Sequence, residues 1–210
     1  MKTTKNLRLA RRTAGWLALA LLLAGCGALA PAPVESPNLH VLQPRSTVRA
    51  GAVSGDVVLE VSAPRAWPGF DTPQMAYVQR PYQLDYFANH RWADAPAQML
   101  GPLLAQALTQ TGRFRAVVQT PSAVPADLRI TGELVRLQQN FSARPSRVEI
   151  TLRIALIDVR GKRVLAAKLF DETETAPSDD AYGGVTAANA ALQRVLEQVA
   201  DFCVVESGNR

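Results

Sequence analysis

Cys26 is the residue with the clearest chemistry in this sequence, because of the residues that stand directly before it. It follows Leu23-Ala24-Gly25, at the end of an 11-residue stretch, 14–24, that is apolar apart from Gly15. Residues 1–13, ahead of this stretch, contain five basic residues and no acidic one. A basic segment followed by a short apolar segment is typical of a secretory signal peptide. A helix that crosses a hydrocarbon core of about 30 Å needs about 20 residues, so the stretch is too short for a stable span.

The motif Leu23-Ala24-Gly25-Cys26 resembles the lipobox of bacterial lipoproteins, in which a leucine and small residues precede the cysteine. This resemblance implies that residues 1–25 are a lipoprotein signal peptide and that the Cys26 thiol carries a diacylglyceryl group. It also implies a further acyl chain on the new amino terminus. Since two or more acyl chains hold a protein firmly on a membrane, we expect permanent anchoring through lipidation of Cys26. The alternative is a plain secreted protein that is cut near Ala24 and keeps a free cysteine.

Removal of the signal peptide changes the charge of the chain. The whole sequence has 23 basic and 18 acidic residues, a formal net charge of +5. Because residues 1–25 hold five of the basic residues and no acidic residue, the mature body is left with 18 of each. A neutral body has no basic excess to attract nucleic acid, and we therefore expect no nucleic-acid partner.

The chain after Cys26 begins with a proline-rich segment. Residues 26–37 contain Pro31, Pro33 and Pro37 among small residues, a composition typical of an extended tether. The short apolar patch 39–42 belongs either to this tether or to an edge strand of the body. We expect a lipidated N-terminus and flexible tether at residues 26–37, followed by one folded domain at residues 38–205.

Hydrophobic periodicity predicts an α+β domain. Apolar residues recur every three or four positions over 96–111 and 185–202, which indicates two amphipathic helices. Asp94 is the candidate N-cap of the first helix and Gly112 its stop signal. Alternating or β-branched segments predict strands at 57–61, 75–79, 83–87, 114–118, 128–134, 148–156 and 164–170.

This order of elements, β-β-β-α-β-β-β-β-α, limits the architecture. Residues 147–174 form a long antiparallel hairpin around the turn Asp158-Val159-Arg160-Gly161-Lys162. Both helices carry an apolar stripe that needs a surface to cover. We therefore predict a single mixed, mostly antiparallel sheet with two amphipathic helices packed on it.

Several motifs occur in an order that resembles one known family. They are Phe70-Asp71-Thr72-Pro73-Gln74-Met75-Ala76-Tyr77, Asn89-His90-Arg91-Trp92-Ala93-Asp94-Ala95-Pro96, Leu103-Leu104-Ala105-Gln106-Ala107-Leu108, Gly112-Arg113-Phe114-Arg115-Ala116-Val117 and Val164-Leu165-Ala166-Ala167-Lys168-Leu169-Phe170. Together they span about residues 38–203 and resemble the ABC-type transport auxiliary lipoproteins, the PqiC-like family.

The resemblance implies an accessory role in the cell envelope. Such a lipoprotein faces the periplasm and accompanies an ABC transporter, with its permease and ATPase, and an MCE-domain protein in lipid transport between the inner and outer membranes. The resemblance implies no catalysis and no cofactor, and phospholipid is a further candidate ligand. Gly27 stands where an aspartate would favour retention in the inner membrane, so the outer membrane is the expected location. The alternative is a structural or assembly lipoprotein of the outer membrane without a transport role.

An aromatic-rich stretch is the candidate contact surface. Residues 67–92 contain seven of the 12 aromatic residues that follow Cys26. The segment Ala66-Trp67-Pro68-Gly69-Phe70 places two rings in a Pro-Gly loop, which is poorly suited to burying both. Because large aromatic side chains dominate many protein interfaces, Trp67 and Phe70 are the predicted partner contacts. The alternative is that both rings are core anchors.

The sequence contains little that indicates a catalytic site or a metal-binding site. The two histidines, His40 and His90, lie outside any hydrolase or paired-histidine motif, so no catalytic residue is predicted. A lipid-modifying hydrolase that uses His90 stays a third hypothesis. Asp179-Asp180 lacks further oxygen ligands at regular spacing, so no metal site is predicted.

Three further features have a structural and a functional interpretation. Arg80 and Arg91 are interpreted as solvated charges at strand ends, with a carboxylate or lipid phosphate as the alternative partner. Gly183-Gly184 precedes a helix and could cradle phosphate, but the acids just ahead would repel it. Cys203 lies in an apolar stripe at helical spacing, which favours a buried, inert thiol.

Overall fold

The structure is a computed structural model that describes residues 36–45 and 53–208, so the predicted signal peptide and Cys26 lie outside the described residues. The elements in chain order are β1 (Asn38–His40), β2 (Val58–Val61), β3 (Arg65–Ala66), β4 (Gln74–Arg80), β5 (Gln83–Trp92), α2 (Pro96–Gln110), β6 (Ala116–Gln119), β7 (Leu128–Asn140), β8 (Arg147–Asp158), β9 (Arg163–Thr175) and α3 (Ala181–Gly208). This order contains every predicted element. It includes, as β1, the edge strand that was one of the two alternatives for the patch 39–42, and it adds the short strand β3.

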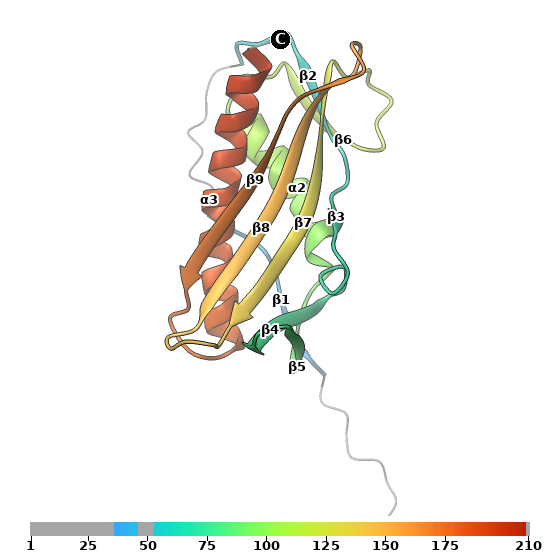
Figure 1. Ribbon diagram of the computed structural model, residues 1–210. Coiled ribbons are helices and arrows are strands. Elements are labelled where there is room, and N and C mark those ends of the chain that lie inside the picture. The colour runs from blue at the N-terminus through green and yellow to red at the C-terminus, as the bar shows by residue number, and fades with distance from the viewer. Residues whose placement is uncertain (1–35, 46–52, 209–210) are drawn as a thin grey trace, which may run out of the picture. The chain divides into compact units, whose positions relative to one another are not determined.

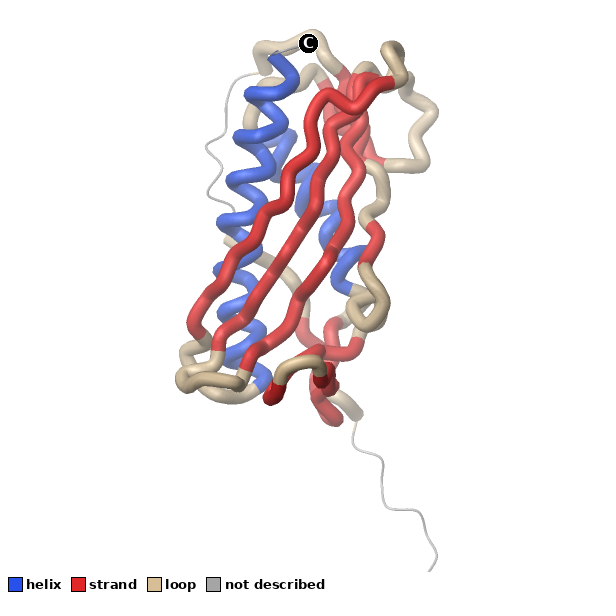
Figure 2. The backbone as a smooth tube through the Cα atoms, viewed as in Figure 1, coloured by secondary structure: helices blue, strands red, loops and turns tan. Residues whose placement is uncertain are grey.

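One mixed sheet forms the body, and both helices lie behind it in the view of Figure 1. The longest ladders are antiparallel and join β7 to β8 and β8 to β9. Shorter parallel ladders attach β2, β3 and β4 to β7, β6 to β2, and β1 to β5. Figure 2 shows β7, β8 and β9 running side by side across the front. The predicted α+β architecture is confirmed.

The long hairpin formed by β8 and β9 follows from alternation of apolar and polar residues. Its register runs from Arg147 opposite Thr175 to Asp158 opposite Arg163, in agreement with the predicted hairpin at 147–174. Alternation gives each strand one apolar face, and this face must be covered. The covering is supplied by α3, which packs against β8 and β9, and by α2, which packs against α3 and β6.

The core lies between the sheet and the two helices. Its largest fully buried side chains are Phe170, Leu59, Leu100, Leu104, Leu108, Leu128, Ile130, Leu134, Ile150, Leu152, Ile154 and Leu156. Cys203 of α3 is fully buried in this core, as predicted, and burial raises the pKa of its thiol to about 12. The thiol is therefore protonated and unreactive at neutral pH. Neither α2 nor α3 combines the length and the apolar character that a membrane span requires.

The start of α2 agrees with the predicted helix at 96–111, but its N-cap differs from the prediction. The helix begins at Pro96 with Ala95 as its N-cap, and no side chain caps it. The carboxylate of Asp94 instead accepts a hydrogen bond of 2.7 Å from the N–H of Ala95, outside the helix. The predicted capping by Asp94 is therefore wrong, because this carboxylate lies one position too early. Gly112, at a φ of 65°, follows the helix end as predicted.

The contacts at the start of α3 explain why two glycines, Gly183 and Gly184, occur in its first turn. Asp180 accepts a hydrogen bond of 2.7 Å from the N–H of Gly183 and so caps the helix, and this bond lowers the pKa of the Asp180 carboxyl. A Cβ added at Gly184 would lie 2.2 Å from Oε1 of Gln139 on β7. Gly184 therefore permits α3 to approach the sheet closely. These contacts favour a packing role over a phosphate cradle for Gly183-Gly184.

Candidate functional site

The loop that carries Trp67 and Phe70 is fixed to the edge of β7. The N–H of Trp67 donates to the carbonyl of Leu134 at 2.9 Å, and the N–H of Phe70 donates to the carbonyl of Trp67 at 2.9 Å. Gly69 in this turn has a φ of 90°, a conformation that glycine adopts without strain. The two predicted contacts thus lie in one tight turn on a rigid strand.

The two rings have different surroundings. Trp67 is 44% exposed, whereas Phe70 is half-buried and packs against the core. The hydroxyl of Tyr86 donates to the carbonyl of Gly69 at 3.1 Å and holds the turn from its other side. Trp67 therefore projects from the body, and Phe70 serves both as an anchor of the turn and as a part of the surface beside it.

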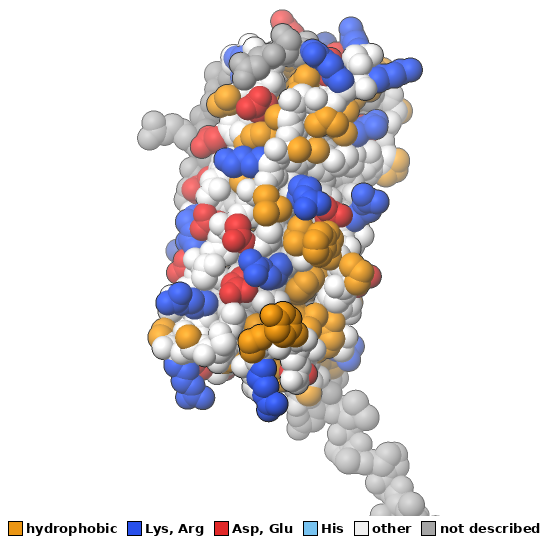
Figure 3. All heavy atoms as spheres, viewed as in Figure 1, with side chains coloured by type: hydrophobic (Ala, Val, Ile, Leu, Met, Phe, Trp, Pro, Cys, Tyr) orange, Lys and Arg blue, Asp and Glu red, His pale blue; other side chains and the backbone are white. Residues whose placement is uncertain are grey.

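A hollow of about 630 Å³ lies beside this turn, on the sheet face opposite the helices. Trp67, Phe70, Tyr82 and Leu169 line it together with Val78, Leu84 and Val135, and we call this surface the β7 groove. Figure 3 shows apolar side chains gathered where β7 meets the segment that carries β3 and β4. An apolar hollow on a sheet face that is otherwise charged is suited to binding an apolar group of a partner.

Tyr82 forms one wall of the β7 groove. It lies in the turn between β4 and β5, where Arg80 pairs with Gln83, and it has a φ of 67°. Its side chain is fully exposed. A non-glycine residue at positive φ is uncommon, so the turn holds this ring in solvent at a cost in backbone strain.

The base of the β7 groove is polar, and its charges are paired. The guanidinium of Arg136 donates to the carboxylate of Asp171 at 3.0 Å and lies 3.3 Å from the carboxylate of Glu149. The hydroxyl of Thr151 also donates to Asp171, and these two donors lower the pKa of the Asp171 carboxyl. Nε of Arg136 is buried without a hydrogen-bond partner. Because the two charged residues that line the groove, Arg136 and Asp171, pair with each other, the groove presents its apolar walls as the main contact surface.

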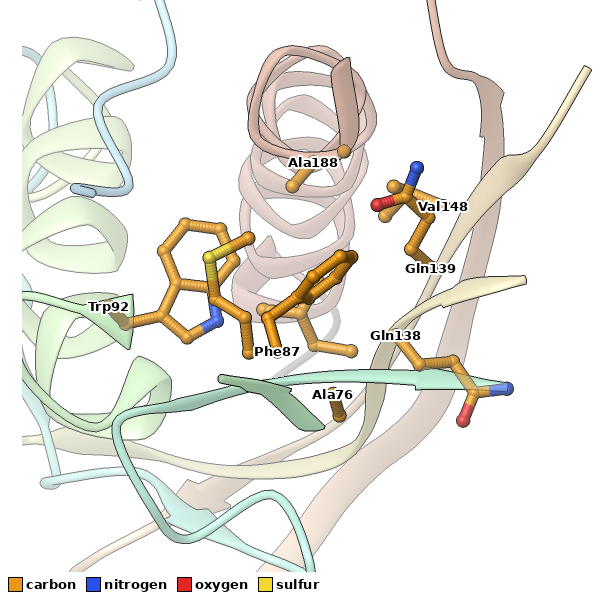
Figure 4. A pocket seen from close by; sticks show the side chains of 10 residues that line it. Ala76, Phe87, Trp92, Gln138, Gln139, Val148 and Ala188 are labelled. Atoms are coloured by element: carbon orange, nitrogen blue, oxygen red, sulfur yellow. The ribbon is translucent and has the colours of Figure 1, made fainter. Parts of the chain in front are cut away.

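A second, smaller space lies inside the core, beneath α3. Figure 4 shows Phe87, Trp92 and Val148 converging there, with the amide of Gln139 beside Ala188 of the helix. Its free volume is about 10 Å³, room for one water molecule at most. Nε2 of Gln139 donates to the hydroxyl of Ser146 at 2.9 Å and to the carbonyl of Asp180 at 3.1 Å, while Oε1 has no partner. This space is too small for a lipid chain.

The remaining polar candidates have structural surroundings. Asp179 accepts a hydrogen bond of 2.7 Å from the N–H of Ser146, so it fixes a loop, as Asp180 fixes a helix start. In the described part of the chain, no group of three or more His, Cys, Asp or Glu side chains could hold a metal ion. Arg80 and Arg91 are both exposed, in agreement with the interpretation as solvated charges. His90 contacts His40, with 3.0 Å between Nδ1 of His90 and Nε2 of His40.

Sequence reasoning found part of the β7 groove and missed the rest. It identified Trp67 and Phe70 from the Pro-Gly loop, but it did not single out Tyr82 or Leu169. The signal for Leu169 was present, because alternation along β9 places it on the face opposite Phe170. The signal for Tyr82 was its position directly after Pro81, in a two-residue turn between strands.

Comparison with known proteins identifies similar chains. The family described as ABC-type transport auxiliary lipoprotein component matches residues 39–200. The crystal structure of protein XCC0632 from Xanthomonas campestris, of family DUF330, is similar with a TM-score of 0.75 and 19% identity, over 82% of this chain and 97% of that one. A second crystal structure, of an uncharacterized protein, has a TM-score of 0.62 and 14% identity, over 80% and 98% of the two chains. No protein with a curated description matches the sequence.

Proposed function

The chain belongs to the ABC-type transport auxiliary lipoprotein component family, and from this membership we propose a specific role in lipid transport. The protein is an envelope lipoprotein that accompanies an ABC transporter and an MCE-domain protein in moving lipids between the inner and outer membranes. It acts by docking and not by catalysis. The observation that carries the proposal is the family match over residues 39–200 behind a lipobox at residues 23–26.

The anchor is lipidated Cys26, which follows cleavage of residues 1–25. Residues 26–37 form the tether and residues 38–205 the docking domain. A fully extended chain spans at most about 3.6 Å per residue, so the 11 residues from Cys26 to Pro37 permit the body to stand about 40 Å from the membrane. Gly27 in place of aspartate favours the outer membrane.

The β7 groove is the proposed contact with the partner complex. Its apolar walls include the exposed ring of Trp67 and the edge of Phe70, and its polar base is neutralised by ion pairs. Such a surface takes an apolar side chain or an acyl group of the partner, since desolvation of the groove costs little. The wall formed by Tyr82 adds a third aromatic contact.

Co-purification tests the role directly. Full-length chain with an affinity tag is extracted in mild detergent, and the recovered proteins are identified. The proposal predicts recovery of a permease, an ATPase and an MCE-domain protein. Consistent failure to recover any of them, with the lipoprotein intact in the membrane fraction, favours the alternative of a structural or assembly lipoprotein of the outer membrane.

A separate experiment tests the anchor. Cells that express the chain are grown with labelled palmitate, and the label is measured on the purified protein. The wild-type chain carries label, and Cys26→Ser removes it together with outer-membrane fractionation. Labelling that persists in Cys26→Ser would contradict the assigned lipidation site without testing the transport role.

A further inference from the structure

Both histidines of the sequence meet in the fold, although 50 residues separate them. Nε2 of His40 and Nδ1 of His90 lie 3.0 Å apart, and the two rings stack with centroids 5.3 Å apart at an interplanar angle of 13°. At this distance one nitrogen donates a proton and the other accepts it. The contact therefore requires that at least one of the two rings is neutral.

This pair lies where the predicted tether joins the body. His40 ends β1, the three-residue edge strand that pairs with β5 through Asn38 opposite His90. The N–H of Ala93 donates to the carbonyl of His40 at 2.7 Å. A three-residue edge strand makes few backbone hydrogen bonds with its neighbour. A side-chain contact between β1 and β5 therefore contributes a large part of the free energy that holds β1 in place.

A second set of contacts holds the residues that follow β1. Leu42 is buried in the core, and Asn189 of α3 bonds the backbone on both sides of it. Its Oδ1 accepts from the N–H of Gln43 at 2.6 Å, and its Nδ2 donates to the carbonyl of Val41 at 3.3 Å. These groups do not titrate near neutral pH. At the end of β1, His40 is the side chain that titrates in mild acid.

One acidic group lies near the pair. Asp180, at the start of α3, interacts electrostatically with His90, which helps to lower the pKa of the Asp180 carboxyl. Burial, and next the charge of His90, lower the pKa of His40. On β5, Arg91 is exposed, and Phe87 packs its uncharged ring edge-on against His90. Asn189 of α3, which bonds the backbone of Val41 and Gln43, is also uncharged.

We propose that His40 and His90 form a pH-operated clasp that sets the free length of the tether. With one proton on the pair, the bond between the rings is charge-assisted and the clasp stays closed. A second proton leaves two cations in contact and no acceptor, and β1 separates from β5. Release of residues 38–40 adds roughly 10 Å to the reach of the tether. The effect on reach rests on the proposed anchor at Cys26, whereas the separation of β1 from β5 is a property of the body and does not depend on the transport role.

Amide hydrogen exchange tests the clasp on the full-length chain in detergent, at about pH 7.5 and at about pH 4.5. Protection factors are used, so that the pH dependence of the intrinsic exchange rate is removed. The reporter is the amide of Ala93, which bonds the carbonyl of His40, and the amide of Ile150 in β8 reports on the body. We expect protection at Ala93 to fall by about tenfold or more at the lower pH, while Ile150 stays protected.

The matched variant is His40→Gln with His90→Gln, which keeps hydrogen-bonding side chains that do not titrate. Its protection at Ala93 should change by less than about twofold between the two pH values. Three results would overturn the clasp: unchanged protection in the wild type, an equal fall in the variant, or loss of protection at Ile150 in parallel with Ala93. The last result would mean unfolding of the whole body.

Discussion

The two faces of the sheet are made of the same alternating strands, yet they differ in what covers them. On β9, Phe170 is 1% exposed and faces α3, whereas its neighbour Leu169 is 51% exposed and faces the β7 groove. Two helices seal the first face. The second face is exposed to solvent and carries ion pairs between strands, such as Arg153 with Glu133 and Arg136 with Asp171. An apolar residue therefore stabilises the fold on one face and is free to serve binding on the other.

The largest expected effect comes from a substitution on the sheet face that the two helices cover. Leu152 of β8 is fully buried, and Leu152→Ala removes packing that the rigid core cannot refill. We expect a loss of about 2–5 kcal/mol in the free energy of unfolding, measured by urea denaturation. The matched control on the other face is Leu169→Ala, with an expected change below about 1 kcal/mol. Equal losses for the two variants would show that the two faces do not differ in this way.

The next effect concerns the close approach of α3 to the sheet. In Gly184→Ala the new Cβ displaces the amide of Gln139, which loses its bonds to Ser146 and Asp180. We expect a loss of about 1–3 kcal/mol in the same assay.

Gly101 of α2 provides the control for this substitution. An added Cβ there meets its nearest atom, Cδ of Pro64, at an ordinary 3.5 Å. Gly101→Ala should therefore stabilise the protein by up to about 1 kcal/mol, because alanine favours a helix interior. Destabilisation by both variants to the same extent would contradict the close approach at Gly184.

The third prediction tests the open face through binding. Trp67→Ala should lower the recovery of the proposed MCE-containing complex by about tenfold, since it removes the exposed aromatic wall of the β7 groove. The free energy of unfolding should change by less than about 1 kcal/mol. Tyr182 is a suitable control, because it is an aromatic residue of α3 that is 69% exposed and lies outside the groove. If Tyr182→Ala lowers recovery as much as Trp67→Ala does, the groove is not the contact.

The same contrast explains what the sequence could predict. The face covered by the helices could be predicted, since the alternation of apolar and polar residues in β7, β8 and β9 and the apolar stripes of both helices directly indicate which side chains are buried. The ends of helices could not be predicted where polar contacts determine them. The helix α3 begins at Ala181, four residues before its apolar stripe, because Asp180 caps it and two glycines permit close packing. On the open face, the Pro-Gly loop indicated Trp67 and Phe70, whereas the alternation that places Leu169 and the turn that places Tyr82 did not by themselves indicate a binding surface.

The pairings of the short strands depended on contacts distant in sequence. The two-residue strand β3 exists because the parallel strand β7 provides its partners, Glu133 and Leu134. The patch 39–42 contains the end of β1, which pairs with β5 some 50 residues later. Neither pairing is visible in local periodicity, since a strand of two or three residues is too short to alternate.

The smallest expected effect is a pH dependence at the base of the β7 groove. The hydroxyl of Thr151 and the guanidinium of Arg136 lower the pKa of Asp171 from its usual 3.8. A carboxylate with a lowered pKa in the folded state stabilises the protein above pH 3.8 and loses this contribution as the pH falls through its folded value. In Asp171→Asn, the urea midpoint should lie slightly below the wild-type midpoint at about pH 6, and the two should converge as the pH falls below 3.8. Solvent screening keeps this difference small, because the side chain of Asp171 is 56% exposed. A constant offset between the two proteins over the whole range would mean that Asp171 contributes through shape and not through its charge.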